Sequence, residues 1–142
     1  MAVSGIQRID HIAIAVHDID AALRFYRDTL GIASSVIQDV PSEGVRIAFL
    51  PLGGPAGSKI ELIQPLDPTN SIGRFLDKHG EGQHHICLQV TDIDAALAEL
   101  QGAGALVLDQ IPRVSAEGRA VFIHPKGTNG VLIELVEVSN KR

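Results

Sequence analysis

The sequence predicts an α+β fold built from two βαβββ modules that share one core. The main observation is an internal repeat, because DHIAIAVHDIDAAL at 10–23 returns as HHICLQVTDIDAAL at 84–97. A repeat of this kind indicates two copies of one structural unit. The second observation is the length, since 142 residues suffice for one ordinary domain but not for two independent cores. We therefore expect a single domain over 1–142.

The first module, about 6–66, is predicted to contain a strand, a helix and three further strands. Alternating apolar residues predict the first strand at 9–16, with His11 on one face among small residues. Asp18 is a favourable N-cap for a helix at 19–30, and a glycine ends that helix. Apolar runs between turn-rich segments predict the three remaining strands, at 32–40, 45–50 and 59–64.

The second module, about 84–138, is predicted to repeat this order after a connector at about 67–83. In the connector, Ser71 is placed to cap a short helix that ends at Gly80. In the module, Asp92 takes the place of the first N-cap and begins a helix that continues to about 102. The predicted strands of this module are 85–90, 105–110, 119–123 and 131–138.

The composition favours a soluble protein without nucleic-acid or membrane partners. Hydrophobic residues make up 45% and charged residues 20%, and the formal net charge is -5 without a basic stripe. The single cysteine, Cys87, allows no disulfide within the chain, so we expect a reducing, cytoplasmic setting. No apolar run approaches the ~20 residues of a membrane span, and the N-terminus lacks a signal-peptide pattern.

Each module contributes one histidine and one glutamate at matching positions of the repeat. His11 in the first strand corresponds to His85, 74 positions later. Glu61 in KIELIQ corresponds to Glu134 in LIELVE, 73 positions later. Either residue type alone is usually structural or solvated, but solvated surfaces do not explain why both recur together. The alignment also leaves His84 on the opposite face of its strand, where we expect it to be structural or to support a metal ligand without binding the metal.

These four residues predict a metal site. A half-buried carboxylate between apolar neighbours is costly unless something neutralises it. Two imidazoles and two carboxylates suit a divalent ion such as Co, Ni, Mn, Zn or Fe. On an octahedral ion they would leave two adjacent positions open. A substrate with two neighbouring oxygens could occupy those positions, where the ion would stabilise a developing enolate.

With these residues in place, the chain resembles the vicinal oxygen chelate superfamily, which also includes glyoxalases, bleomycin-resistance proteins and dioxygenases. Within it, the chain is most similar to the methylmalonyl-CoA epimerase family. The resemblance rests on DHIAIAV, FYRDTLG, ELIQPL, GEGQHHICLQV and HPKGTNGVLIELVE, and covers almost the full length. It implies an open barrel-like mixed sheet around a metal. It also places the family's metal ligands on the same four residues, His11, Glu61, His85 and Glu134.

The resemblance further implies interconversion of (R)- and (S)-methylmalonyl-CoA by C2 proton abstraction, a step of propionate metabolism. Inversion needs an acid/base group on each face of C2. Glu134 is our candidate for one, and Glu43 for the other, although the family often shows Pro-Glu-Gln-Gly where this chain has Pro-Ser-Glu-Gly. The acyl-CoA phosphates are expected to contact basic residues, namely Lys126, Arg119 and Arg113. Many relatives dimerise, so a homodimer is implied as well.

Two alternative functions remain open. The first is a glyoxalase I-like lactoylglutathione lyase, which would use the same fold and the same four ligands. The second, of another class, is a metal-independent small-molecule binding or drug-sequestering protein of the bleomycin-resistance type. Such a protein would not need all four ligands, so the presence of both histidine–glutamate pairs favours an enzyme.

Overall fold

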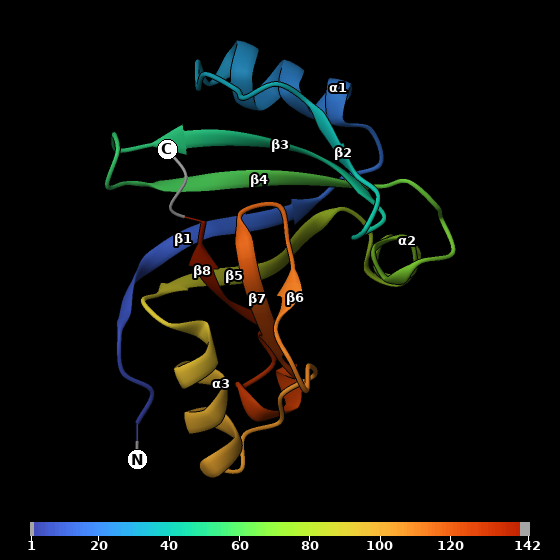
Figure 1. Cartoon of the computed structure of the whole chain (residues 1–142). Helices are drawn as coiled ribbons and strands as arrows, with labels where there is room; N and C mark the ends of the chain where they lie inside the picture. Colours follow the sequence, from blue (N-terminus) through green and yellow to red (C-terminus); the bar gives the residue numbers. More distant parts are fainter. Residues whose placement is uncertain (1, 140–142) are drawn as a thin grey trace. The chain divides into compact units, whose positions relative to one another are not determined.

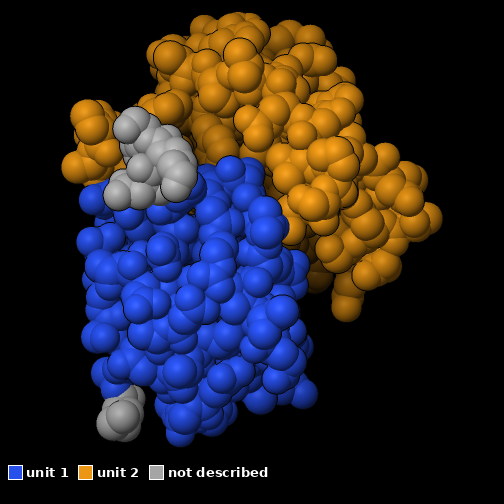
Figure 2. All heavy atoms as spheres, in the orientation of Figure 1, with its two compact units in different colours: residues 1–10, 85–142 blue, residues 11–84 orange. Residues whose placement is uncertain are grey.

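The computed structural model describes residues 2–139, which form two compact units (Figures 1 and 2). Unit 2, orange in Figure 2, consists of residues 11–84. Unit 1, blue, combines residues 85–139 with residues 2–10 at the start of the chain. Each unit carries strands and helices of one expected module, which confirms the α+β class and the two βαβββ modules.

Unit 2 contains a mixed sheet with the hydrogen-bonded strand order β2-β3-β4-β1. β1 runs parallel to β4, whereas β3 is antiparallel to both β4 and β2. Its elements are β1 (Ile6–Ala15, of which residues 11–15 lie in this unit), α1 (Ile19–Leu23), the π-helical η1 (Arg24–Thr29), β2 (Gln38–Val40), β3 (Val45–Leu52), β4 (Ser58–Pro65) and α2 (Ser71–His79).

Unit 1 repeats this topology with the strand order β5-β8-β7-β6. β5 runs parallel to β8, β7 is antiparallel to β8, and β6 is antiparallel to β7. Its elements are β5 (Gly82–Val90, from residue 85 on), α3 (Ile93–Gly102), β6 (Arg113–Val114), β7 (Gly118–Ile123), the 3₁₀ turn η2 (Pro125–Gly127) and β8 (Ile133–Val138). The two modules therefore have the same connectivity as well as related sequences.

The N-terminal segment of β1 is held within unit 1 by hydrogen bonds to residues 89 and 91. The Thr91 backbone N–H donates to the Gly5 carbonyl at 3.1 Å, an ordinary distance for a backbone hydrogen bond. Arg8 donates to the Gln89 side chain at 3.0 Å, and the Gln89 amide donates to Gln7 at 3.2 Å. The strand begins at Ile6, three residues before the predicted start, because these contacts extend its pairing.

Each sheet packs one face against its module's first helix. In unit 2, Leu62 and Leu50 join Ile19 and Leu23 of α1 in one apolar cluster. In unit 1, the corresponding cluster joins residues of β7 and β8 to α3, with Val121, Leu135, Ile93 and Leu97 among its members. The histidines and glutamates of interest lie on the other face of each sheet. That face of unit 2 also packs against α2 through Ile72 and Leu76.

Two predicted strands were wrong over most of their length. Of the strand predicted at 32–40, only Gln38–Val40 is a strand, because the Ser35 hydroxyl accepts the Phe49 N–H in place of a backbone carbonyl. The strand predicted at 105–110 is reduced to an isolated bridge between Val107 and Ile123. There the Asp109 carboxylate accepts the Phe122 N–H. The third strand pairing of unit 1 is supplied instead by β6, which the sequence did not predict.

Both predicted aspartate N-caps are confirmed. Asp18 accepts from the backbone N–H of Asp20, and Asp92 accepts from that of Ala95. The helix predicted at 19–30 is divided into α1 and η1, the latter with π-helical hydrogen bonds such as Leu30 N–H to the Phe25 carbonyl.

The cap predicted for the connector helix was one residue off. Asn70, not Ser71, is the N-cap of α2, and its Oδ1 accepts from the Gly73 N–H at 3.0 Å. Its Nδ2 also donates to the Gly44 carbonyl at 2.9 Å, so the same side chain fixes the turn that carries Glu43. Asparagine and serine are both good N-caps, and the additional bond to the Gly44 carbonyl favours position 70 over position 71.

We expect Asn70→Ala to lower the free energy of unfolding by about 1–2 kcal/mol, because it removes an N-cap bond and a tie to the Gly44 carbonyl. Urea denaturation measures this change. Ser71→Ala is the matched control, and we expect it to stay within about 0.5 kcal/mol of the wild type. Equal losses in both variants would contradict the assignment of the cap.

No helix among residues 2–139 is both long and apolar enough to cross a membrane.

Candidate functional site

In unit 2, His11 and Glu61 form a buried pair on neighbouring strands. His11 lies on β1 and Glu61 on β4, and the register places Glu61 opposite Ala13. Nε2 of His11 is 3.3 Å from Oε1 of Glu61. The two residues are only 3% and 6% exposed. A carboxylate at this depth requires a partner, and the imidazole provides one.

In unit 1, His85 and Glu134 form the equivalent pair. His85 lies on β5, and Glu134 on β8 is opposite Cys87, which is the repeat partner of Ala13. Nε2 of His85 is 3.0 Å from Oε1 of Glu134, and both residues are 5% exposed. The structure thus brings each predicted histidine together with the glutamate of its own module.

Each glutamate also has a phenylalanine as its neighbour on the next strand. Phe49 on β3 pairs with Glu61, and Phe122 on β7 pairs with Glu134. The Phe49 and His11 rings meet edge to face with centroids 5.8 Å apart, and those of Phe122 and His85 with centroids 5.4 Å apart. Apolar rings beside each pair limit its contact with water.

The sequence reasoning missed these two phenylalanines. They are separated by 73 positions, the same offset that relates Glu61 to Glu134. That shared offset was the signal that could have found them. A second signal was that each phenylalanine is the only aromatic residue of its strand. The other residues on the same face of β3 and β7 are aliphatic or small.

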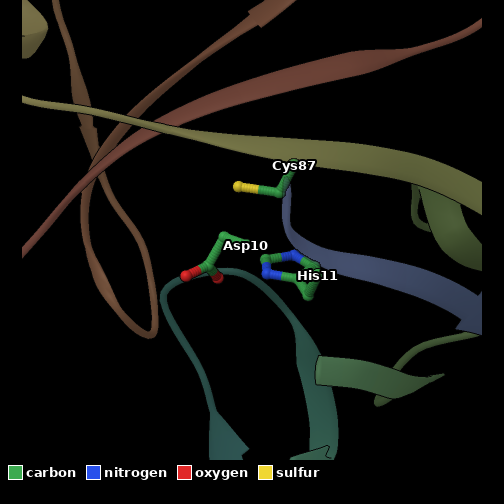
Figure 3. A group of neighbouring side chains, drawn as sticks. All are labelled: Asp10, His11 and Cys87. Carbon is green, nitrogen blue, oxygen red and sulfur yellow. The ribbon is translucent and has the colours of Figure 1, made fainter. Parts of the chain in front are cut away.

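Asp10 and Cys87 add two further potential donors in unit 1. Both residues are buried. Asp10 is the last residue of β1 that belongs to unit 1, and Cys87 lies on β5. A carboxylate oxygen of Asp10 and Sγ of Cys87 lie within 4.8 Å of one another. Figure 3 shows these two side chains together with His11, the next residue along β1. Cys87 also packs against Ala120 and Val136, so its thiol is part of a small apolar cluster.

The donor set fits a divalent metal ion. Each unit supplies one imidazole nitrogen and one carboxylate oxygen from nearly buried side chains, and these donor types suit borderline first-row ions. An ion would also neutralise carboxylates that are otherwise removed from water.

Glu43 lies in the tight turn between β2 and β3 and is half-buried. Its backbone N–H donates to the Val40 carbonyl at 3.0 Å. The next residue, Gly44, has a φ of +69°, and its carbonyl accepts from the Asn70 side chain and from the Leu66 N–H. The backbone that carries the Glu43 carboxylate is therefore fixed from two sides.

Two of the three predicted acyl-CoA contacts are engaged with neighbouring carboxylates. Arg119 forms two hydrogen bonds of 2.9 Å to Asp94, and this bonding holds the pKa of the Asp94 carboxyl below its usual range. Arg113 binds Asp109, with Nη2 and Oδ1 2.6 Å apart. Both arginine side chains are about half exposed.

Lys126 lies in η2 and is exposed, and its backbone N–H donates to Nδ1 of His124 at 2.9 Å. A shallow cavity of about 360 Å³ in unit 1 is lined by Leu106, Val107, Leu108, His124 and Lys126. Apolar side chains and a lysine therefore line the same cavity.

The remaining histidines lie in structural or exposed positions. The His84 ring meets that of Phe75 on α2 at a centroid distance of 4.9 Å, so it packs with the connector helix. His17, His79 and His124 are exposed. The expectation that His84 has a structural environment agrees with this packing.

The chain matches the profile of the glyoxalase/bleomycin resistance protein/dioxygenase superfamily over residues 10–122. It is 46% identical over 136 residues to the ethylmalonyl-CoA/methylmalonyl-CoA epimerase of Cereibacter sphaeroides, covering 94% of this chain and 99% of the relative. By contrast, a probable lactoylglutathione lyase of Synechocystis is 29% identical over 132 residues, covering 93% and 96%.

Solved structures agree with the sequence matches. The fold superposes with a TM-score of 0.88 on a variant of the Streptomyces coelicolor methylmalonyl-CoA epimerase in complex with 2-nitronate-propionyl-CoA. That protein is 40% identical to this chain, and the match covers 94% of this chain and 99% of the other. The methylmalonyl-CoA epimerase of Mycobacterium tuberculosis superposes with a TM-score of 0.89 at 38% identity, covering 98% and 93%.

Proposed function

Because the chain belongs to the glyoxalase/bleomycin resistance protein/dioxygenase superfamily and, within it, to the methylmalonyl-CoA epimerases, we propose that it interconverts (R)- and (S)-methylmalonyl-CoA. The observation that carries this proposal is the recurrence of a buried histidine–glutamate pair in both modules. Within a family of epimerases, such paired donors are suited to a metal-dependent proton transfer at carbon.

His11, Glu61, His85 and Glu134 would together hold one divalent ion, with Co, Ni, Mn or Zn as the candidates. Their burial and the mixed imidazole and carboxylate donors support this assignment. When bound, such an ion supplies positive charge that stabilises the negative charge developing on the substrate as its C2 proton leaves.

Proton transfer at C2 is assigned to Glu134 and Glu43. Inversion requires one group to accept the proton and another to deliver one to the opposite face. Glu134 is a buried carboxylate beside an imidazole, an environment in which a proton can be exchanged away from bulk water. Glu43 is supported by its fixed turn, since a proton-transfer group must be held within hydrogen-bond reach of its target.

Lys126 is the proposed contact for the phosphates of the acyl-CoA. It is exposed among the residues that line the cavity in unit 1, and within residues 2–139 its ammonium group forms no ion pair. An ammonium group without a carboxylate partner can bind a phosphate without breaking an existing ion pair. Arg119 stays a weaker candidate, because its guanidinium already binds Asp94.

The test is incubation of the metal-loaded protein with (S)-methylmalonyl-CoA in deuterated water, followed by NMR at C2 and chiral analysis. We expect deuterium incorporation together with inversion. The same preparation is then given the methylglyoxal–glutathione adduct, for which we expect no turnover. Conversion of that adduct without C2 exchange would replace the proposal with a lactoylglutathione lyase, and binding without turnover of either would favour a sequestering protein.

We also propose that the protein works as a cytoplasmic homodimer in propionate metabolism. The relatives' named substrate supports the metabolic assignment, and the single cysteine of the chain, which allows no disulfide within it, supports a reducing setting. Sedimentation equilibrium measures the oligomeric state directly.

A further inference from the structure

In unit 1, Phe122 lies between the metal-binding candidates and a cation. Its ring meets His85 edge to face at 5.4 Å with an interplanar angle of 84°, and its backbone pairs with Glu134. The guanidinium of Arg113 lies over the same ring, 5.0 Å from the centroid. Attraction between a cation and an aromatic face holds the ring in one orientation.

Asp109 holds both Arg113 and Phe122 in place. Its Oδ1 accepts from Nε of Arg113 at 2.8 Å, and its Oδ2 accepts from the Phe122 backbone N–H at 2.7 Å. The Asp109 side chain is only 9% exposed, so these charge-assisted bonds are shielded from solvent. One carboxylate therefore fixes the cation and the ring relative to each other.

Unit 2 contains a corresponding contact between a histidine, a phenylalanine and a cation. Phe49 meets His11 at 5.8 Å, and Nζ of Lys59 lies over the Phe49 ring at 5.4 Å. The Ser35 hydroxyl accepts the Phe49 N–H at 2.9 Å, as Asp109 does for Phe122.

The two cations are not repeat partners. Phe49 and Phe122 correspond in the repeat, but Lys59 lies on β4 whereas Arg113 lies on β6. Duplication of a module would copy the phenylalanine together with its cation. A cation supplied independently in each module indicates that the contact between cation and ring is itself required.

We propose that Arg113 is a positioning residue that orients the His85 imidazole through Phe122, and that Lys59 does the same for His11 through Phe49. This inference rests on the proposed metal centre and replaces the expectation that Arg113 contacts the acyl-CoA. A metal-binding imidazole needs a fixed ring orientation, and groups that support a ligand change metal affinity by about 10- to 100-fold. Arg113 therefore acts on metal binding without touching the metal or the substrate.

The experiment measures Co²⁺ affinity by the absorption bands of the bound ion in the full-length protein. We expect Arg113→Gln to weaken Co²⁺ binding about 10-fold, measured at a temperature at which the metal-free variant is still folded. Arg113→Lys should recover most of the affinity, because it restores a cation over the ring. The matched control is Arg119→Gln, which removes another half-exposed, carboxylate-bound arginine and should leave Co²⁺ affinity as in the wild type.

Phe122→Leu tests the route of the effect. We expect it to weaken Co²⁺ binding, and Arg113→Gln added to it should cause no further loss, because the arginine then has no ring to hold. Unchanged Co²⁺ affinity in Arg113→Gln, with a raised KM for methylmalonyl-CoA, would overturn the positioning role and return Arg113 to substrate contact. Failure of the wild type to bind Co²⁺ would instead reject the metal centre, and the positioning role with it.

Discussion

His85→Ala is expected to lose metal binding and epimerase activity together. The substitution removes an imidazole donor and leaves the Glu134 carboxylate buried without its partner at 3.0 Å. Loss of a group that merely supports a ligand costs about 10- to 100-fold in affinity, so loss of a ligand should cost more than about 100-fold. Elemental analysis after dialysis, together with C2 exchange, measures both effects. Glu61→Ala should behave in the same way.

The neighbouring histidine provides the matched control. His84 precedes His85 in the chain but packs against Phe75 in unit 2. We expect His84→Ala to retain both its metal and its exchange rate. Metal content that is unchanged in His85→Ala and Glu61→Ala would show that these residues are not the ligands, whatever the effect on activity.

Glu43→Gln is expected to impair proton exchange from one enantiomer of methylmalonyl-CoA far more than from the other. The substitution keeps the shape of the side chain and removes only its ability to accept a proton. General base catalysis contributes about 10²- to 10⁴-fold, and a loss of this size should appear for the enantiomer whose C2 proton faces Glu43. Exchange in deuterated water, started separately from each enantiomer and followed by NMR, gives the two rates.

Asp39→Asn is the control for this experiment. Asp39 is a nearby exposed acid bound to Arg46 at 2.7 Å, and that hydrogen bond holds the pKa of its carboxyl below its usual range. A carboxyl group bound in this way is a poor proton acceptor, so its loss should affect neither enantiomer. Near-native exchange from both enantiomers in Glu43→Gln would exclude Glu43 as a base.

The repeat predicted the fold, and it predicted which histidine belongs with which glutamate. Its offsets of 74 and 73 positions chose His85 over His84 and matched Glu61 with Glu134. The structure places each glutamate beside the histidine of its own module. The role of the four residues as ligands of one ion stays a prediction, because a sequence pattern identifies candidate ligands and does not show a bound ion.

The errors arose where side chains replace backbone groups as hydrogen-bond partners. The run at 105–110 alternates like a strand, yet Leu106 and Leu108 are about half exposed and Asp109 takes the bond that a strand carbonyl would accept. The run at 32–37 fails for the same reason at Ser35. Apolar alternation cannot reveal such a replacement, since it reports which residues avoid water and not which atoms pair.

The bonds between strand ends and helix starts have a consequence for folding. Oε1 of Gln64, near the end of β4, accepts from the Ile19 N–H at the start of α1, and Oε1 of Glu137 does the same for Ile93 of α3. A slip of one residue between paired strands would turn Glu61 or Glu134 to the opposite face. Such a slip would also break the bond at the helix start. In each module, misaligned strand pairings are therefore less stable than the correct one during folding, whether or not a ligand is bound.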